Sequence, residues 1–302
     1  MNEEIIIKSD SNEFSNIRID VFISLKMNFS RNYAVVLINE EKVFKNNVLV
    51  KKSSLKINIG DEVKIIKKKE TLSEKKEEKI FIKVIYENND FLAIDKPPFI
   101  SVHKASVKDQ SYTISDWIKD NKIFKDDFLE NEKFERSGIV HRLDKETSGV
   151  LLIAKNRKAQ DFFSNLFEKR MIKKKYIAIV DGKINEAGVI DYKIIRNPLN
   201  PIKMTYSIGQ GRDSLTEYKL LNFHKNRYSE VLCLPKTGRT HQIRVHLASI
   251  GFPIVGDKLY GKESNEIKRQ ALHAFSLEFE YEGSFLEINT GEIPEDIKKL
   301  IF

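Results

Sequence analysis

The sequence predicts an α+β protein in which a small α/β unit precedes a larger domain built on a mixed, largely antiparallel sheet. Its 302 residues suffice for one large domain or two. Residues 67–79, KKKETLSEKKEEK, hold six lysines and four glutamates and almost no apolar residue, which indicates a linker between units at 1–66 and 80–302. Beyond this linker, short alternating apolar runs separated by turn residues predominate, as expected for strands joined in hairpins.

The first unit is predicted to contain two short helices and a few short strands. Apolar spacing indicates helices at residues 17–25 and 31–38, the second of them capped by Ser30. Asn46-Asn47 lies between two apolar runs, and asparagine tolerates the left-handed conformation that a tight hairpin turn requires. Residues 63–66 are expected to form another strand, and the first 16 residues form either a loose arm or one edge strand at residues 5–7.

The second unit is predicted to alternate strands with amphipathic helices. Turn residues 88–90 join its first two strands, and Pro97 ends the second strand because proline cannot continue a hydrogen-bond ladder. Thr240 is expected to cap a helix that ends near Ser249. The other expected helices are 114–118 and 157–169, and the expected strands are 81–86, 91–95, 149–154, 173–180, 216–223 and 228–234.

The composition favours a cytoplasmic protein with a polyanionic partner. The net charge of +8 and the pI of about 9.2 point first to nucleic acid. No apolar run reaches the roughly 18 residues of a membrane span, and the N-terminus lacks the features of a signal peptide. The single cysteine, Cys233, cannot form an internal disulfide and lies in an apolar strand. We therefore expect a cytoplasmic monomer with no membrane partner.

A dense group of ionisable side chains directly precedes the predicted strand 149–154. It includes His141, Arg142 and Asp144, followed by Lys145 and further polar residues. A strand end holds side chains rigidly at a cleft, and a packed core does not need so many charges beside it. Asp144 is therefore the candidate catalytic carboxylate. On chemistry alone, an Asp144 that caps a turn and pairs with Lys145 explains the pattern equally well.

The stretch HRLDKETSGVLLIAK, which begins at His141, resembles the signature of the RluA-type pseudouridine synthases. In this family the aspartate of the signature is catalytic, which implies that role for Asp144. The other matching stretches are DFLAIDKPPFISVH, with Phe99 where the family usually has glycine, TGRTHQIRVHLASIGFPIVGDKLYG from Thr237, and RQALHA from Arg269. The resemblance implies a pseudouridine synthase catalytic domain for residues 80–302.

The same resemblance implies roles for residues far from Asp144 in the sequence. Tyr176, in KKKYIAIV, is expected to stack on the target base, and Arg244 is expected to pair with Asp144. Arg142 alternates onto the same side of an extended stretch as Asp144, and is the candidate to fill the space that a flipped nucleotide leaves. The other expected substrate contacts are His141, Arg239 and His241.

The first unit is similar to an S4-type RNA-binding domain. The matching residues are Arg18-Ile19-Asp20, Ser30-Arg31, Leu37-Ile38, Val43, Asn46-Asn47 and Gly60-Asp61. This resemblance implies binding to structured RNA. The expected phosphate contacts are Arg31, Lys51, Lys52 and Lys56. For any one of these residues taken alone, an ordinary solvated surface charge is the alternative.

These features predict an RNA pseudouridine synthase that acts on uridines in large-subunit ribosomal RNA or its assembly intermediates. The reaction is an isomerisation without redox change, so we expect no cofactor. His241 and His246 lie on different faces of a helix, so we expect no shared metal. A transfer-RNA synthase of the same family is the nearest alternative. A non-catalytic RNA-binding or ribosome-assembly protein is another, which the combination of Asp144, Tyr176 and Arg244 argues against.

A glycosyl-bond hydrolase with paired carboxylates is the last alternative. Its pair would be Asp144 and Glu146, which lie only two residues apart. Acid and base carboxylates of such enzymes usually come from separate elements, and the release of free uracil from RNA would identify this activity.

Overall fold

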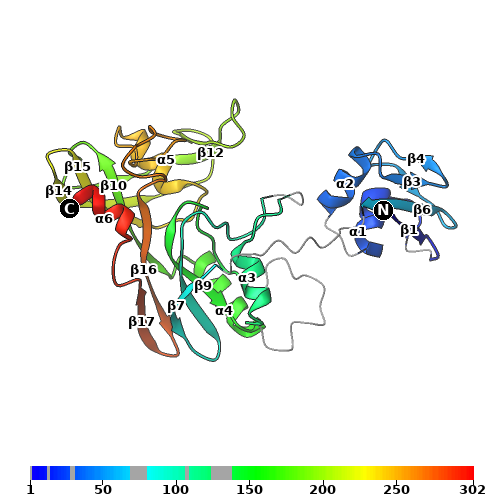
Figure 1. Ribbon diagram of the computed structural model, residues 1–302, viewed down its shortest axis with the longest axis horizontal. Helices are drawn as coiled ribbons and strands as arrows, with labels where there is room; N and C mark the ends of the chain where they lie inside the picture. Colours follow the sequence, from blue (N-terminus) through cyan, green and yellow to red (C-terminus); the bar gives the residue numbers. More distant parts are fainter. Residues whose placement is uncertain (1, 12–13, 28–30, 69–79, 106–108, 124–137) are drawn as a thin grey trace. The chain divides into compact units, whose positions relative to one another are not determined.

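The computed structural model describes residues 2–11, 14–27, 31–68, 80–105, 109–123 and 138–302. The chain divides into two compact units, Met1–Ile80 and Phe81–Phe302 (Figure 1). Each unit has its own buried core. The last strand of the first unit runs to Lys68, two residues into the predicted linker. The rest of that linker, 69–79, lies outside the described residues.

The first unit packs two helices against a small antiparallel sheet with the strand order β1-β6-β3-β4. Both predicted helices and the predicted strands are present, whereas the proposed cap Ser30 lies outside the described residues. The elements are β1 (Asn2–Lys8), β2 (Ile17–Arg18), α1 (Ile19–Met27), α2 (Arg31–Asn39), β3 (Val43–Lys45), β4 (Val48–Leu49), β5 (Lys56–Ile57) and β6 (Glu62–Lys68).

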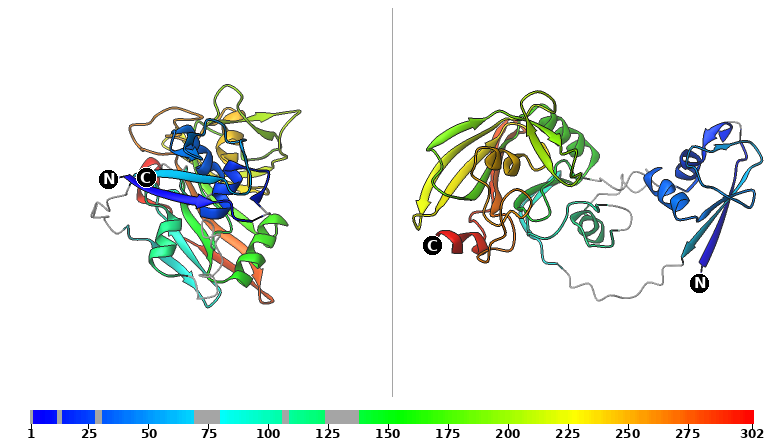
Figure 2. Two further views of the ribbon diagram at one scale, coloured as in Figure 1. Left: turned by 90° about the vertical axis from the view of Figure 1, so that its right-hand side faces the viewer. Right: turned by 90° about the horizontal axis from the view of Figure 1, so that it is seen from above.

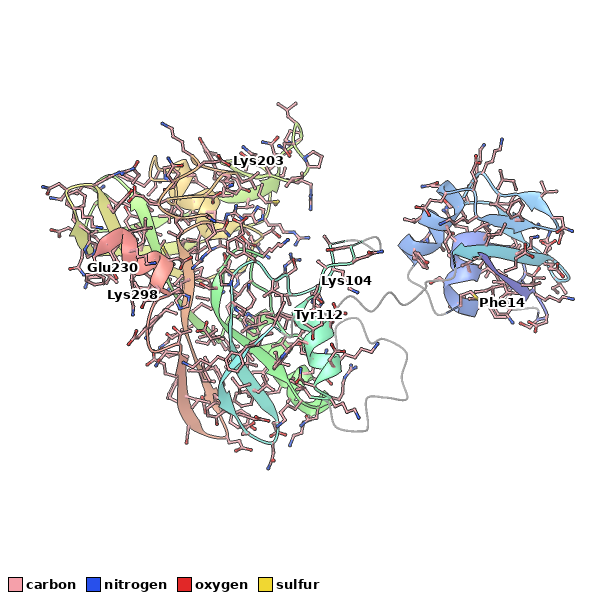
Figure 3. The ribbon with its side chains drawn as sticks, in the orientation of Figure 1. Phe14, Lys104, Tyr112, Lys203, Glu230 and Lys298 are labelled. Carbon is pink, nitrogen blue, oxygen red and sulfur yellow. The ribbon has the colours of Figure 1, made fainter. Side chains whose placement is uncertain are left out.

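The hairpin and the core of this unit form as the residue types predict. Asn46 and Asn47 both adopt positive φ angles, 49° and 64°, between the paired strands β3 and β4. The Phe22 side chain is fully buried, and the ring of Phe14 meets it edge to face with 5.6 Å between the ring centroids. Phe14 is labelled in Figure 3. The apolar faces of the helices therefore close over one side of the small sheet.

The second unit is built on a mixed sheet of nine strands among the described residues. The strand order is β11-β14-β15-β10-β16-β9-β8-β7, with β17 also paired to β16. Every neighbouring pair is antiparallel except β16 and β9, which confirms the predicted α+β class with a largely antiparallel sheet. The strands twist along the sheet, as Figure 2 shows from two further directions.

The strands of this sheet are β7 (Lys83–Glu87), β8 (Phe91–Lys96), β9 (Ser148–Ala154), β10 (Lys173–Asp181), β11 (Ala187–Ile190), β14 (Thr216–His224), β15 (Tyr228–Pro235), β16 (Leu272–Tyr281) and β17 (Ser284–Asn289). A separate hairpin pairs β12 (Lys193–Arg196) with β13 (Met204–Ser207). Lys203, at the turn end of this hairpin, is labelled in Figure 3.

Helices α3 (Ile114–Asp120) and α4 (Arg157–Glu168) pack against opposite faces of β8 and β9. Side chains alternate between the two faces of a strand. Phe163 of α4 packs with Val150, whereas Ile118 of α3 packs with Leu151, the next residue of β9. The other half of the sheet carries α5 (Gln242–Ser249) and α6 (Glu295–Ile301).

The start of α5 differs from the sequence prediction. The helix begins at Gln242, and the residue that caps it is His241 rather than Thr240. His241 has a φ of 56°, which is uncommon for a residue other than glycine although histidine adopts it more often than most, and its side chain makes no capping hydrogen bond. The histidine ring is therefore directed elsewhere.

Two residues show where backbone sterics decide the identity of a side chain. A Cβ at Gly149 would lie 2.1 Å from the carbonyl oxygen of Ala274, so only glycine permits the close parallel contact of β9 with β16. Phe99 has a φ of 69°, a conformation that glycine adopts without steric hindrance, and its ring is exposed. Residue 99 therefore adopts a left-handed conformation, although it is phenylalanine where the family usually has glycine.

None of the described helices is long and apolar enough to cross a membrane. Cys233 lies in β15 and is fully buried, as expected, and this burial raises the pKa of its thiol to about 12. The thiol is therefore protonated and inaccessible at neutral pH.

Candidate active site

A cavity of about 450 Å³ lies where the turn before β9, strand β10 and the start of α5 meet. Its volume falls in the range of small-molecule sites. Its lining includes all seven residues of the second unit that the sequence singled out: His141, Arg142, Asp144, Tyr176, Arg239, His241 and Arg244. Six of the side chains that line it are arginine or lysine and two are acidic, so the cavity suits an anionic ligand.

Asp144 precedes β9 in a tight turn that the amide of Thr147 closes by donating to the Asp144 carbonyl at 3.1 Å. Its side chain is 20% exposed and accepts a hydrogen bond from Arg244 Nη1 at 2.9 Å. The predicted pairing of Asp144 with Arg244 is therefore present in the geometry, across 100 residues of sequence. The alternative partner, Lys145, is exposed on the turn.

Arg244 has a second and more extensive partner that the sequence reasoning missed. Its Nε and Nη2 atoms donate to the two oxygens of Asp257 at 2.7 and 2.9 Å, and Asp257 is completely buried. Burial by itself would lower the pKa of Arg244, but the hydrogen bonds and charges of Asp257 and Asp144 outweigh it and raise that pKa. Arg244 is therefore a permanent cation with a fixed orientation.

His241 points toward Asp144 because Tyr260 holds the other side of its ring. The Tyr260 hydroxyl accepts from the amide of Met204 at 2.8 Å and lies 2.8 Å from His241 Nδ1. The hydroxyl hydrogen can then be donated to Nδ1, which leaves a proton on Nε2, 3.9 Å from Asp144 Oδ2. Burial lowers the pKa of His241 more than the Asp144 charge raises it, so the ring is neutral at physiological pH.

Tyr176 is the fourth residue of β10, which begins at Lys173 as predicted. The register with β16 shifts between Lys175 and Tyr176, and a bulge of this kind re-aims a side chain. Burial, followed by the charge of Asp144, raises the pKa of the Tyr176 phenol. The phenol therefore stays neutral over the whole range of an enzyme assay and presents an aromatic surface to the cavity.

His141 is engaged by the protein framework. Its Nε2 accepts the amide hydrogen of Leu152 at 2.9 Å, and its ring stacks on Phe167 at 4.5 Å. Burial, followed by the charge of Lys174, lowers the pKa of His141 to about 3, so the ring is neutral. Because Nε2 is already engaged, the predicted contact of His141 with substrate can involve only the Nδ1 side of its ring.

The predicted contacts Arg142 and Arg239 belong to the basic edge of the cavity. Arg142 is exposed, and Arg239 donates from Nε to the carbonyl of Asp213 at 3.1 Å. Lys174, which the sequence reasoning did not single out, donates to the carbonyl of Thr237 at 2.8 Å. Burial, together with the charges of Arg170 and Arg239, lowers the pKa of Lys174 to about 8.

Lys96 supports the turn of Asp144 from within the protein. It is fully buried, and its ammonium donates to the carbonyls of Pro97, Ile100 and Lys145 at 2.8, 3.0 and 3.3 Å. Burial and the charge of Arg269 lower the pKa of Lys96 to about 7. Among the described residues, no group of three histidine, cysteine or acidic side chains is placed to hold a metal ion.

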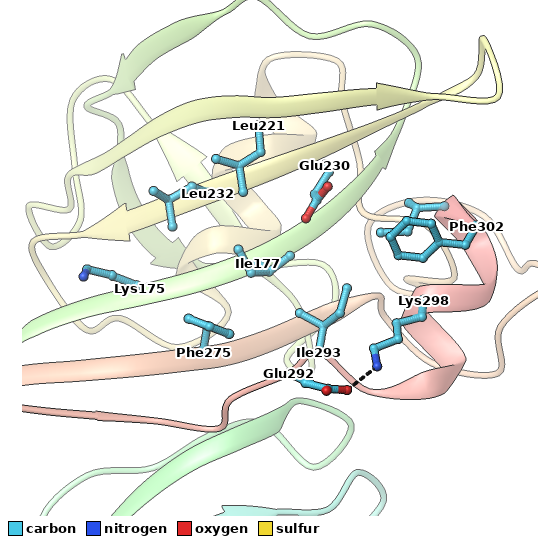
Figure 4. Close-up of a pocket in the computed structure, with 11 residues that line it drawn as sticks. Lys175, Ile177, Leu221, Glu230, Leu232, Phe275, Glu292, Ile293, Lys298 and Phe302 are labelled. Atoms are coloured by element: carbon cyan, nitrogen blue, oxygen red, sulfur yellow. Dashed lines mark hydrogen bonds and ion pairs between the residues drawn. The ribbon is translucent and has the colours of Figure 1, made fainter.

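A second hollow, of about 510 Å³, differs in chemistry (Figure 4). Its wall is mainly apolar and includes Ile177 and Phe275. The charged residues at its edge are already paired, Lys298 with Glu292 and Lys175 with Glu278 and Glu287. It therefore offers less for acid–base chemistry than the cavity of Asp144.

The residues that the sequence reasoning missed lie in stretches it had already singled out. Asp257 and Tyr260 belong to the string from Thr237 to Gly261, and Asp257 follows Gly256 in its Gly-Asp pair. The available signal in the sequence was that Asp257 follows closely after the predicted helix that carries Arg244. Its bidentate contact with Arg244 depends on how the chain returns after α5, which spacing along the sequence does not show.

Comparisons with known proteins identify the family of the chain. The family model described as RNA pseudouridylate synthase matches residues 90–249, just over half of the chain. A relative named ribosomal large subunit pseudouridine synthase D from Buchnera aphidicola is 33% identical over 95% of this chain and 94% of its own. An uncharacterized RNA pseudouridine synthase from Aquifex aeolicus is 36% identical over 84% and 80%.

A solved structure of human RNA pseudouridylate synthase domain containing 1 superposes with a TM-score of 0.57. It is 28% identical, and the match covers 70% of this chain and 84% of the human one. The chain therefore belongs to the RluA-type RNA pseudouridine synthases, and it is an RNA isomerase.

Proposed function

We propose that the protein converts specific uridines of large-subunit ribosomal RNA to pseudouridine, with Asp144 as the catalytic carboxylate. The observation that carries the proposal is the 2.9 Å contact of Asp144 with Arg244 in a basic, nucleotide-sized cavity. The name of the Buchnera relative supports the choice of RNA. Ribosomal RNA is modified where ribosomes are assembled, so we place the reaction in the cytoplasm.

The reaction needs an ionised carboxylate beside the ribose. The bond from uracil N1 to ribose C1′ breaks, the uracil turns, and C5 bonds to C1′. C5 then loses its proton and N1 gains one, so the product is an isomer of the substrate. A carboxylate can assist by attacking C1′ or by removing a proton from the ribose. Arg244 and the neutral His241 both face Asp144, and Arg244 Nη1 places a fixed positive charge 2.9 Å from the Asp144 carboxylate.

The target nucleotide must also leave its RNA helix, which costs a few kcal/mol. We infer that Arg142 enters the space that the nucleotide vacates, because it is exposed at the cavity edge two residues before Asp144. Tyr176 is the aromatic surface for the freed base. Its ring lines the same cavity, and its phenol is held neutral by burial.

Replacing Tyr176 by leucine is expected to lower kcat between about 5-fold and about 150-fold, because stacking contributes about 1–3 kcal/mol per base. Tyr176→Phe keeps the aromatic face and should stay within about threefold of wild type. The assay is tritium release from RNA labelled with [5-³H]uridine, since product formation removes hydrogen from C5. Equal rates for the leucine and phenylalanine variants would contradict a stacking role.

We further propose that the first unit is an S4-type RNA-binding domain. Asp20 is almost completely buried and bridges two partly exposed arginines, Arg18 and Arg31, each with an Nε–oxygen distance of 3.0 Å. The guanidinium N–H groups of these two arginines that do not contact Asp20 are thereby held in place to donate to phosphate oxygens. Lys51, Lys52 and Lys56 are exposed on the same unit. Arg18 was not among the predicted phosphate contacts, and we add it to them.

Replacing Lys51, Lys52 and Lys56 together by glutamine is expected to weaken RNA binding and its salt dependence. Each lost phosphate contact reduces the slope of log K against log salt by roughly 0.7–0.9, so the triple variant should lose about 2 to 3. Filter binding of ribosomal RNA at several salt concentrations measures this. Lys8→Gln with Lys64→Gln is the matched control, because both lysines pair with glutamates across β1 and β6. An unchanged slope in the triple variant would contradict the proposal.

The RNA substrate is tested by mapping pseudouridine with carbodiimide and reverse transcription. Ribosomal and transfer RNA are compared from cells that contain the protein and cells that lack it. Sites lost only from large-subunit ribosomal RNA support the proposal. Sites lost only from transfer RNA would replace it with the transfer-RNA alternative.

A further inference from the structure

The turn that carries Asp144 is held by two consecutive residues from a distant segment. Arg269 Nη1 donates to the carbonyl of Glu146 at 3.1 Å, and Gln270 Nε2 donates to the hydroxyl of Thr147 at 3.1 Å. Both Glu146 and Thr147 belong to the turn that starts at Asp144. Backbone and side-chain groups of the turn are thus fixed from more than 100 residues away.

Arg269 is completely buried and uses both sides of its guanidinium. Its Nε and Nη2 atoms donate to the two carboxylate oxygens of Asp296, at 2.6 and 2.9 Å. Its Nη1 atom reaches the carbonyls of Gln270 and Leu272 at 3.3 and 3.2 Å, besides that of Glu146. Asp296 lies in the first turn of α6, so this arginine connects the C-terminal helix to the catalytic turn.

The same segment packs against the residues that precede Asp257. The Ala271 amide donates to the carbonyl of Val255 at 2.9 Å. A Cβ at Gly256 would lie 2.3 Å from the carbonyl oxygen of Arg269, so the two backbones are in direct contact. Residues 269–271 therefore lie between the turn of Asp144 and the partner of Arg244.

We propose that Arg269 is a positioning residue for Asp144, and that Asp296 on α6 holds Arg269 in place. The arginine sets the position of the catalytic turn relative to Asp257, and through Asp257 relative to Arg244. The inference rests on the proposed catalytic role of Asp144. A displacement of about 1 Å at a reacting group can lower a rate about 100-fold, so small shifts of this turn matter.

The chemistry of the site explains why an arginine is required there. A buried cation needs a paired anion, and Asp296 provides it. The planar guanidinium also reaches three carbonyls that point in from one side, which a lysine ammonium on a flexible stem cannot do while it pairs with Asp296. Loss of these donors leaves the Glu146 carbonyl unsatisfied and the turn free to shift.

The test uses the full chain with Arg269→Lys, Asp296→Asn and, as matched control, Glu295→Gln. Glu295 lies beside Asp296 in α6, and its carboxylate is 76% exposed and pairs with Lys298 on the surface. The substrate is ribosomal RNA from cells that lack the enzyme, labelled with [5-³H]uridine. Tritium release gives kcat and KM, filter binding gives RNA affinity, and thermal melting gives stability. Asp144→Asn is run in parallel.

For Arg269→Lys we expect kcat to fall about 10-fold to about 100-fold, with KM and RNA affinity within about twofold of wild type. Asp296→Asn should lower kcat about 3-fold to about 10-fold, since the amide oxygen still accepts one hydrogen bond. Glu295→Gln should match wild type in all measurements.

A loss of thermal stability in Arg269→Lys with a wild-type kcat would overturn the proposal, because the arginine would then only support the fold. If Arg269→Lys does not fold, Asp296→Asn decides: a wild-type kcat overturns the proposal and a reduced kcat at constant KM supports it. Activity retained by Asp144→Asn would instead refute the proposed role of Asp144, and the positioning role with it.

Discussion

Replacing Asp144 by asparagine is expected to abolish pseudouridine formation while the protein stays folded. Asparagine has nearly the same shape as aspartate but can neither attack C1′ nor remove a ribose proton. We expect a fall in kcat on the order of 10⁴-fold or more, as for other residues that act directly on the substrate. Arg244 keeps its bidentate partner Asp257, so the buried cation remains compensated.

The measurement combines tritium release from [5-³H]uridine-labelled ribosomal RNA with thermal melting of both proteins. Glu146→Gln is the matched control, because Glu146 is the neighbouring carboxylate two residues away and its side chain is not part of the cavity lining. Full activity of Glu146→Gln would also exclude a hydrolase that uses Asp144 and Glu146 as its pair of carboxylates. A wild-type rate in Asp144→Asn would contradict the mechanism proposed here.

Replacing Asp257 by asparagine is expected to lower both stability and activity. Removing one partner of a buried ion pair typically costs about 3–5 kcal/mol. Asp144, which is 20% exposed and accepts a single hydrogen bond from Arg244, compensates the Arg244 charge only in part. For a unit of this size, that loss corresponds to a decrease of roughly 6–20 °C in the melting temperature. Arg244 would then lose its fixed orientation toward Asp144, and kcat should fall about 100-fold.

Asp181→Asn is the control for this prediction. Asp181 also pairs with an arginine, Arg227, but its side chain is 60% exposed and the Nε–oxygen distance is 3.4 Å. An exposed pair of this kind contributes little, so its melting temperature and rate should be those of wild type. If Asp257→Asn behaves like Asp181→Asn, then Asp257 does not hold Arg244 in the functional enzyme.

Much of the secondary structure was predictable because its signals are local, although strands β2, β5, β11–β13, β16 and β17 and helix α6 were not predicted. Strand β9 follows from an uninterrupted apolar run, and the hairpin of β3 and β4 follows from two asparagines that accept positive φ. The start of α5 was not predictable in the same way. Its residue types favour Thr240 as the N-cap. In the structure the N-cap is His241, which adopts a left-handed conformation and contacts Tyr260. Tertiary contacts outweighed a preference of about 1 kcal/mol for a capping side chain.

The candidate site was partly predictable for the same reason. By itself, the sequence determined the alternation of strands and helices, the basic charge, and a resemblance that singled out Asp144, Tyr176 and Arg244. Only the tertiary structure decided that Arg244 is shared between Asp144 and Asp257, and that Arg269 supports the turn between them. Helix and strand preferences depend on residues a few positions apart, whereas these contacts join residues 13, 100 and 123 positions apart and depend on how the folded chain brings them together.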